Sequence, residues 1–172
     1  ASSIVALRLR GNLEQPRAAL VIQAGELQGQ GNIALHPFAT QPLASLNLIL
    51  NGINPQRFSA DFPMANLNLA VNLQQTAQNS LQGNLNLQNT QPRPIDQSGV
   101  PLRQTHMRIS LADETIVLDE IAILLGQAKD MKANLSGNVT WHMDSAAGFA
   151  NIDVHRLNPA LLDTRMQSAS LS

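Results

Sequence analysis

Apolar and polar residues alternate along most of this chain. The most regular stretch, residues 66–89, reads NLNLAVNLQQTAQNSLQGNLNLQN, with Leu or Val on many odd positions and Asn or Gln on many even ones. Successive side chains of a β-strand point to opposite faces, so this period of two gives each strand one apolar and one polar face. The stretch therefore predicts two antiparallel strands, joined across residues 74–80, with a continuous apolar surface.

The same alternation predicts strands along the rest of the chain. We expect strands over residues 4–10, 18–24, near Leu27, and over 32–35, 43–51, 103–111, 115–119, 121–125 and 149–155, with the longest alternation over 131–143. Asn-Pro pairs predict a helical turn at residues 55–58 and a short helix at 160–166. Turns are expected at Asp113-Glu114 and over residues 126–130. No segment of any length has a period of 3.6 residues, which predicts an all-β chain.

The apolar residues of these strands are expected to share one concave surface. Hydrophobic residues make up 44% of the chain but aromatic residues only 3%, with no Tyr. A compact β-sandwich normally fills its centre with large aromatics, so this composition favours an open or elongated sheet. The residues predicted to line the groove are Leu46, Leu48, Leu50, Leu67, Leu69, Val71, Leu85, Leu87, Met107, Ile109, Leu111, Leu135, Val139, Trp141, Ile152 and Val154.

Charge and cysteine content exclude several classes of function. A net charge of −1, with 13% charged residues, argues against a nucleic-acid surface, which needs clustered Lys and Arg. The absence of cysteine removes disulfides, thiolate chemistry and Cys-based metal sites. The first residues, ASSIVALRLR, lack the basic and apolar regions of a signal peptide. We expect residues 1–172 to be one β-rich fragment of a larger protein.

Candidate catalytic residues do not assemble into a recognisable pattern. His36, His106, His142 and His155 fall on different predicted segments, with no two at metal-ligand spacing. The acidic pairs Asp113-Glu114 and Asp119-Glu120 are interpreted as solvated turns at strand ends, and Gly25, Gly29 and Gly31 as strand-end glycines. We therefore expect no enzyme activity, no metal and no cofactor.

Two segments form a degenerate internal repeat. Residues 31–58 and 137–162 both run Gly-Asn-apolar, strand, His, turn, strand and then an apolar residue followed by Asn-Pro. Such copies suggest strands added one after another to a growing sheet, as in elongated β proteins.

A Pro-rich loop and its flanks carry a resemblance to a known family. The segment GNLNLQNTQPRPIDQSGVPL, residues 83–102, resembles a segment of the TamB family, the inner-membrane-anchored subunit of the translocation and assembly module of diderm bacteria. In that family a strand is followed by an Asn, a Pro-rich turn, an Asp and a Pro-Leu. Here Arg93 stands before Pro94 where Pro-Gly is expected. The matching residues are Asn89, Pro92, Pro94, Asp96, Pro101 and Leu102.

The resemblance implies a fold, a place and a task. It implies a sheet curled lengthwise into a trough with a hydrophobic interior, in a periplasmic protein anchored in the inner membrane by a segment outside this fragment. It also implies a TamA-type outer-membrane barrel as partner. The function expected is a non-catalytic conduit or chaperone that shields phospholipid acyl chains or unfolded outer-membrane protein strands between the two membranes.

Two other interpretations stay open. The strands of an integral outer-membrane β-barrel also alternate, but the lack of Tyr and the single Trp disfavour it because aromatic girdles mark both membrane interfaces. A surface-exposed structural β-repeat module is the other, although its repeats should be shorter and more regular.

Overall fold

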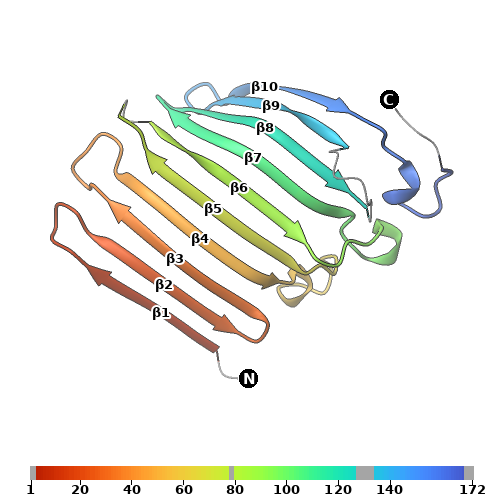
Figure 1. Cartoon of the computed structure of the whole chain (residues 1–172), viewed down its shortest axis with the longest axis horizontal. Helices are drawn as coiled ribbons and strands as arrows, with labels where there is room; N and C mark the ends of the chain where they lie inside the picture. The colour runs from red at the N-terminus through yellow and green to blue at the C-terminus, as the bar shows by residue number, and fades with distance from the viewer. Residues whose placement is uncertain (1–2, 78–79, 127–133, 169–172) are drawn as a thin grey trace.

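The chain forms one open antiparallel sheet. The computed structural model describes residues 3–77, 80–126 and 134–168. Ten strands lie side by side in chain order, each paired with its sequence neighbours, with β1 and β10 at opposite edges of a curved sheet (Figure 1). The all-β, antiparallel fold predicted from the alternation is confirmed. The strands are β1 (Ser3–Arg10), β2 (Arg17–Ala24), β3 (Leu27–Leu35), β4 (Leu43–Ile53), β5 (Leu67–Gln75), β6 (Leu81–Asn89), β7 (Leu102–Ala112), β8 (Thr115–Leu125), β9 (Leu135–His142) and β10 (Ala147–Val154).

Gly29 and Gly31 lie inside a strand and not at strand ends. Two short strands were expected around Gly29 and Gly31, but β3 runs unbroken from Leu27 to Leu35. Both glycines lie inside the strand and pair with Leu50 and Leu48 of β4. A methyl group on Gly29 would lie 2.6 Å from Leu50 Cδ2, so the missing side chain leaves room for the leucine. The interpretation of Gly29 and Gly31 as strand-end residues is wrong.

Asp119 and Glu120 lie within a strand and not in a turn. Two strands with a turn between them were expected, but β8 is one strand from Thr115 to Leu125. The extra residue is absorbed by a β-bulge, with Glu120 at a φ of 50° and its carboxylate 2.7 Å from the Arg108 guanidinium. Asp113-Glu114, in contrast, does form the predicted turn, with both residues at positive φ.

Short 3₁₀ helices occur where the Asn-Pro pairs stand. They are η1 (Pro55–Arg57) and η3 (Pro159–Leu161), and η2 (Ile95–Gln97) lies in the Pro-rich loop. The side chains of Asn54 and Asn158 cap η1 and η3 in the same way, each accepting a backbone hydrogen bond of 3.1 Å from the second residue after it. The two repeat copies thus end in the same local structure, but the helix expected over residues 160–166 is a single turn.

Few side chains are fully buried. The buried hydrophobic residues are Ala65, Leu81, Ile121 and Leu124. Among the described elements, extensive contacts occur only between neighbouring strands, so the described part of the chain places no second layer over either face of the sheet. The predicted strand start at residue 131 and most of the turn at 126–130 lie outside the described residues, and β9 begins at Leu135.

Candidate functional site

The strand register places apolar residues in rows that cross the whole sheet. Directly paired residues of neighbouring antiparallel strands share a face. One row contains eight apolar side chains together with Gly29 and Thr105. It runs Val5, Ile22, Gly29, Leu50, Leu69, Leu87, Thr105, Ile123, Leu135 and Val154 from β1 to β10.

Parallel rows lie on the same face of the sheet. A second runs Leu9, Ala18, Ile33, Leu46, Leu73, Gly83, Ile109, Leu118, Val139 and Ala150. A third runs Leu7, Leu20, Gly31, Leu48, Val71, Leu85 and Met107, and continues beyond the β8 bulge as Ile121, Gly137 and Ile152. We call the surface formed by these three rows the apolar face.

The residues predicted to line a groove are brought together on this side of the sheet. Most belong to the three rows. Leu67 lies on the same face because it stands two residues before Leu69 in β5. Leu111 and Trp141 both pair with Ile116 of β8, so they belong to a further row on this side of the sheet. That this side is the concave wall of a groove stays a prediction.

The apolar face is open to solvent at its edges and half-buried in its middle. Leu7 in β1 is 62% exposed and Ile152 in β10 is 45% exposed, whereas Leu48, Leu69 and Leu85 are half-buried by their neighbours within the sheet. Soluble proteins rarely leave a continuous apolar surface of several strands uncovered unless it binds something. The apolar face is therefore the candidate site of the molecule.

The opposite face is mostly polar and uncharged, with a few exposed apolar side chains such as Val21, Ile49 and Phe149. One of its rows is an asparagine ladder, Asn32, Asn47, Asn72 and Asn84, which crosses β3 to β6. The Asn72 amide nitrogen donates to the Asn47 side-chain oxygen. Amide side chains can donate hydrogen bonds to water and accept them from it, which aliphatic side chains cannot do, so the two faces have opposite wetting properties.

Three of the histidines contact neutral polar groups on neighbouring strands. His106 lies 2.8 Å from the Asn86 side-chain oxygen, His142 lies 3.1 Å from the Thr115 hydroxyl, and His155 lies 3.3 Å from the Ser136 hydroxyl. In the described ranges no group of three or more histidine or carboxylate side chains is placed to hold a metal ion.

The loops at one end of the sheet form a connected structure, which we call the loop cap: residues 54–66, 90–101, 126 and 155–165. The loops of residues 54–66, 90–101 and 155–165 lie on the right-hand side of Figure 1. Backbone hydrogen bonds join them: Met64 N–H to Ser98 (2.8 Å), Gly126 N–H to Pro101 (2.6 Å) and Ile95 N–H to Leu162 (2.8 Å). The loop cap thus ties together segments about 100 residues apart in the chain.

Asn89 anchors the loop cap to the sheet. Its side chain is 2% exposed and makes three hydrogen bonds of 3.1–3.2 Å. The oxygen accepts from the backbone N–H groups of Asn66 and Gln91, and the nitrogen donates to the carbonyl of Val100. The residues that carried the family resemblance therefore have a structural role here: Asn89 joins two loops, Pro94 precedes η2, and Pro101 accepts from Gly126.

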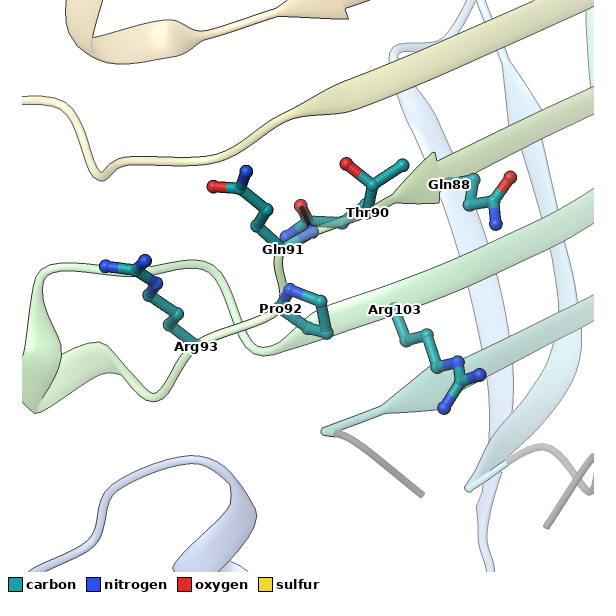
Figure 2. Close-up of a pocket in the computed structure, with 7 residues that line it drawn as sticks. Gln88, Thr90, Gln91, Pro92, Arg93 and Arg103 are labelled. Carbon is teal, nitrogen blue, oxygen red and sulfur yellow. Dashed lines mark hydrogen bonds between the residues drawn. The ribbon is translucent and has the colours of Figure 1, made fainter. Parts of the chain in front are cut away.

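A hollow of about 530 Å³ lies beside this anchor (Figure 2). Its two cationic side chains, Arg93 and Arg103, lie on either side of Pro92 and point away from each other (Figure 2). Because the two arginine side chains do not point toward a common position, we do not consider this hollow a binding site.

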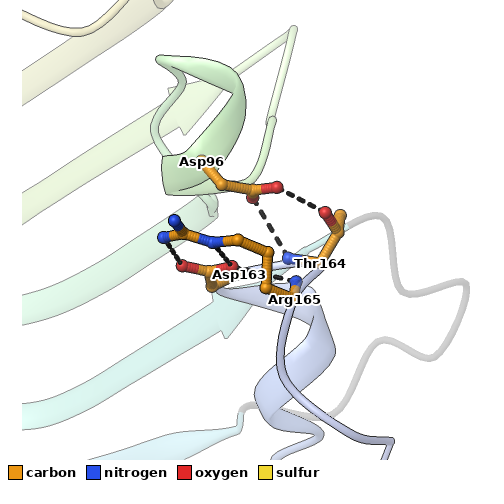
Figure 3. Close-up of polar contacts among 4 residues, drawn as sticks. All are labelled: Asp96, Asp163, Thr164 and Arg165. Atoms are coloured by element: carbon orange, nitrogen blue, oxygen red, sulfur yellow. Dashed lines mark hydrogen bonds and ion pairs between the residues drawn. The ribbon is translucent and has the colours of Figure 1, made fainter.

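One carboxylate, Asp96, fastens the chain after η3 to the Pro-rich loop, and a second, Asp163, pairs with Arg165 within that chain (Figure 3). Asp96 accepts hydrogen bonds from the Thr164 hydroxyl and from its backbone N–H (3.1 Å), and these bonds lower the pKa of Asp96. Asp163 accepts from the Arg165 guanidinium and backbone N–H (2.9 Å), which lowers the pKa of Asp163 from 3.8 to about 2. Sequence reasoning singled out Asp96 through the resemblance alone and missed Asp163, Thr164 and Arg165, since nothing local marks them.

Comparisons with protein-family models, curated proteins and solved structures found no match to this chain. None of the helices in its described part has the length and apolar character to cross a membrane.

Proposed function

We propose that the apolar face is a non-catalytic binding surface for an extended apolar chain, either a phospholipid acyl chain or an unfolded, apolar strand of another protein. The observation that carries this proposal is the set of apolar rows that crosses all ten strands with no covering layer in the described chain. A monomeric domain that folds around a core would bury such residues, whereas here most of them remain half-exposed or exposed, and Ile121 is the buried exception among the apolar side chains of the three rows.

The side chains on this face suit a flexible apolar ligand. Leu, Ile and Val present rounded aliphatic surfaces, and Trp141 is the one aromatic side chain in the described rows of this side. Contacts of this kind are non-directional, and each methylene group removed from water contributes about 0.8 kcal/mol. A surface without fixed polar groups would accept acyl chains of different lengths, which is what a conduit or chaperone requires.

The resemblance to the TamB family extends the proposal to the cell. In this proposal the chain is a periplasmic fragment of a longer, inner-membrane-anchored protein that works with a TamA-type outer-membrane barrel. Its cargo would be phospholipid or nascent outer-membrane protein in transit between the membranes. The support for this part is the motif of residues 83–102 and the open apolar face.

The test compares two charged substitutions in the same strand. Leu69 of β5 lies on the apolar face between Leu50 and Leu87, whereas Gln74 of β5 is exposed on the polar face. We expect Leu69→Arg to weaken binding of cis-parinaric acid, a fluorescent fatty acid, about tenfold or more, because losing contacts with two methylene groups removes about 1.6 kcal/mol. Gln74→Arg adds the same charge on the other face and should bind like the wild type.

Far-ultraviolet circular dichroism checks that each variant keeps its strands. If Leu69→Arg does not fold, Leu69→Ser replaces it, with a smaller loss of affinity expected. Equal binding of the fatty acid by the wild type and a folded Leu69 variant would overturn the proposal. So would equal weakening by Gln74→Arg, because binding would then not depend on the face.

A further inference from the structure

Three arginines gather at one corner of the polar face. Arg8 and Arg10 occupy alternate positions of β1, and Arg17 begins β2 directly opposite Arg10. The corner lies where β1 turns into β2, at the left of Figure 1. These three residues are on the side of the sheet opposite Leu7 and Leu9, so the corner is separate from the apolar face.

Placing these three positive charges close together lowers the stability of the folded chain. Directly paired residues have Cβ atoms about 5 Å apart, so like charges at Arg10 and Arg17 repel. Elsewhere in the described chain, ion pairs join Arg57 to Glu26, Arg108 to Glu120 and Arg165 to Asp163, but none includes an arginine of this corner. The closest acidic residue in the sequence, Glu14, lies in the connecting turn and makes no ion pair with the three arginines in the described structure.

The arginines border a hollow that small residues leave open. The hollow measures about 610 Å³, and Ala19, Ala34 and Ser45 are among its lining residues. Ala19 is paired with Arg8, and Ala34 with Arg17. The short neighbouring side chains leave the guanidinium groups free to turn toward one ligand, while Asn32 adds an amide to the lining.

We propose that this corner binds a phosphate group. A guanidinium presents a planar fork of N–H donors that matches phosphate oxygens two at a time, and three such forks offset a doubly charged anion. The phosphate can belong to a lipid headgroup or be free in solution, since the corner recognises the same oxygens in both. The proposal does not depend on the function proposed for the apolar face.

The experiment titrates the 172-residue chain with inorganic phosphate by calorimetry at fixed ionic strength. Three proteins are compared with the wild type: a variant with Arg8, Arg10 and Arg17 all changed to Gln, a variant with all three changed to Lys, and the control Arg156→Gln. We expect the Gln variant to lose about tenfold or more in affinity, because its charged donors are gone. The Lys variant keeps the net charge but not the fork and should weaken binding severalfold. The control removes one exposed arginine from the other end of the chain and should bind normally.

A second arm identifies the source of the phosphate. Co-sedimentation is measured with vesicles of phosphatidylcholine alone and of phosphatidylcholine with phosphatidylglycerol. Binding to the mixed vesicles that disappears in the Gln variant supports a lipid headgroup, and phosphate binding without vesicle binding supports the free anion. The proposal is overturned if the wild type binds neither probe, if the Gln variant binds as well as the wild type, or if the Lys variant does.

The same proteins separate this proposal from the previous one. The Gln variant should bind cis-parinaric acid like the wild type, and Leu69→Arg should bind phosphate like the wild type, because the two sets of residues lie on opposite faces.

Discussion

The apolar face and the loop cap hold their side chains in different ways. On the apolar face, residues such as Leu69 and Leu85 repeat at a period of two and are half-buried by similar neighbours. At the loop cap, by contrast, the anchoring residue Asn89 of β6 is fully buried, and its side-chain oxygen and nitrogen each have specific partners. The face is a surface of interchangeable apolar groups, whereas the cap depends on particular atoms at particular places.

This difference assigns stability and binding to separate regions. Removing a half-exposed leucine takes away few contacts, since much of its surface already faces water. Removing a buried amide leaves its partners without hydrogen bonds and without water, which costs more per atom. The loop cap should therefore govern whether the chain folds, and the apolar face should govern what it binds.

The largest effect is expected at Asn89. Asn89→Ala leaves the N–H groups of Asn66 and Gln91 and the carbonyl of Val100 without their hydrogen-bond partner. The free energy of unfolding should therefore fall by about 3 kcal/mol. Urea denaturation followed by circular dichroism measures it. Gln88→Ala is the control, because its exposed side chain should contribute less than about 0.5 kcal/mol. A loss below about 1 kcal/mol at Asn89 would remove the distinction between the two regions.

A pair of leucines on the same side of β6 tests whether the middle of the apolar face is open. Leu81, at the start of the strand, is 4% exposed, whereas Leu85, in its middle, is half-buried. We expect Leu81→Ala to lower the free energy of unfolding by about 2–3 kcal/mol and Leu85→Ala by about 1 kcal/mol. The same urea titration compares them. If Leu85→Ala costs as much as Leu81→Ala, the apolar face is a buried core and not an open surface.

The smallest effect concerns acid. The pKa of Asp163 is lowered from 3.8 to about 2 by the Arg165 guanidinium, so the stabilisation from this contact is fully present above about pH 4 and is lost as the pH falls toward 2. We expect the melting temperature of the wild type to fall in this window. Asp163→Asn, which cannot ionise, should show a weaker dependence. Asp144→Asn, in an exposed turn, should keep the wild-type profile, and a profile of Asp163→Asn equal to that of the wild type would contradict the role of this contact.

Much of the fold could be predicted from the alternation because a strand is a local structure. The paired strands β5 and β6 were expected from leucines at odd positions, and the structure pairs Leu69 with Leu87 and Val71 with Leu85. The predictions failed where the local conformational preference of a residue conflicts with the pairing of its strand to a neighbouring strand. Gly29 and Gly31 indicate breaks when read alone, and Asp119-Glu120 indicates a turn. Leucines of β4 fill the space at the glycines, and a bulge absorbs the acidic pair.

The candidate sites also include parts that the sequence predicts and parts that only the structure reveals. Within a regular strand, membership of the apolar face follows from sequence parity, but the bulge in β8 shifts that parity between Leu118 and Ile121, and the residues of β1, β2, β3 and β8 on this face were not among those expected. The arginine corner could not, because the opposition of Arg10 and Arg17 depends on where β1 ends and β2 begins. Nor could the buried contacts of the loop cap, since Asp96 and Thr164 are 68 residues apart in the chain.

The amino-acid sequence by itself determined the strands and their two unlike faces, because the direction of a side chain in a strand depends only on whether its position is odd or even. Only the tertiary structure decided which of the many asparagines is buried and hydrogen-bonded to the backbone. Asn86 and Asn89 lie three residues apart in β6, yet one is exposed on the polar face and the other is buried among three backbone partners. The difference arises because burial and hydrogen bonding depend on distant segments, here residues 66 and 100, that only folding brings together.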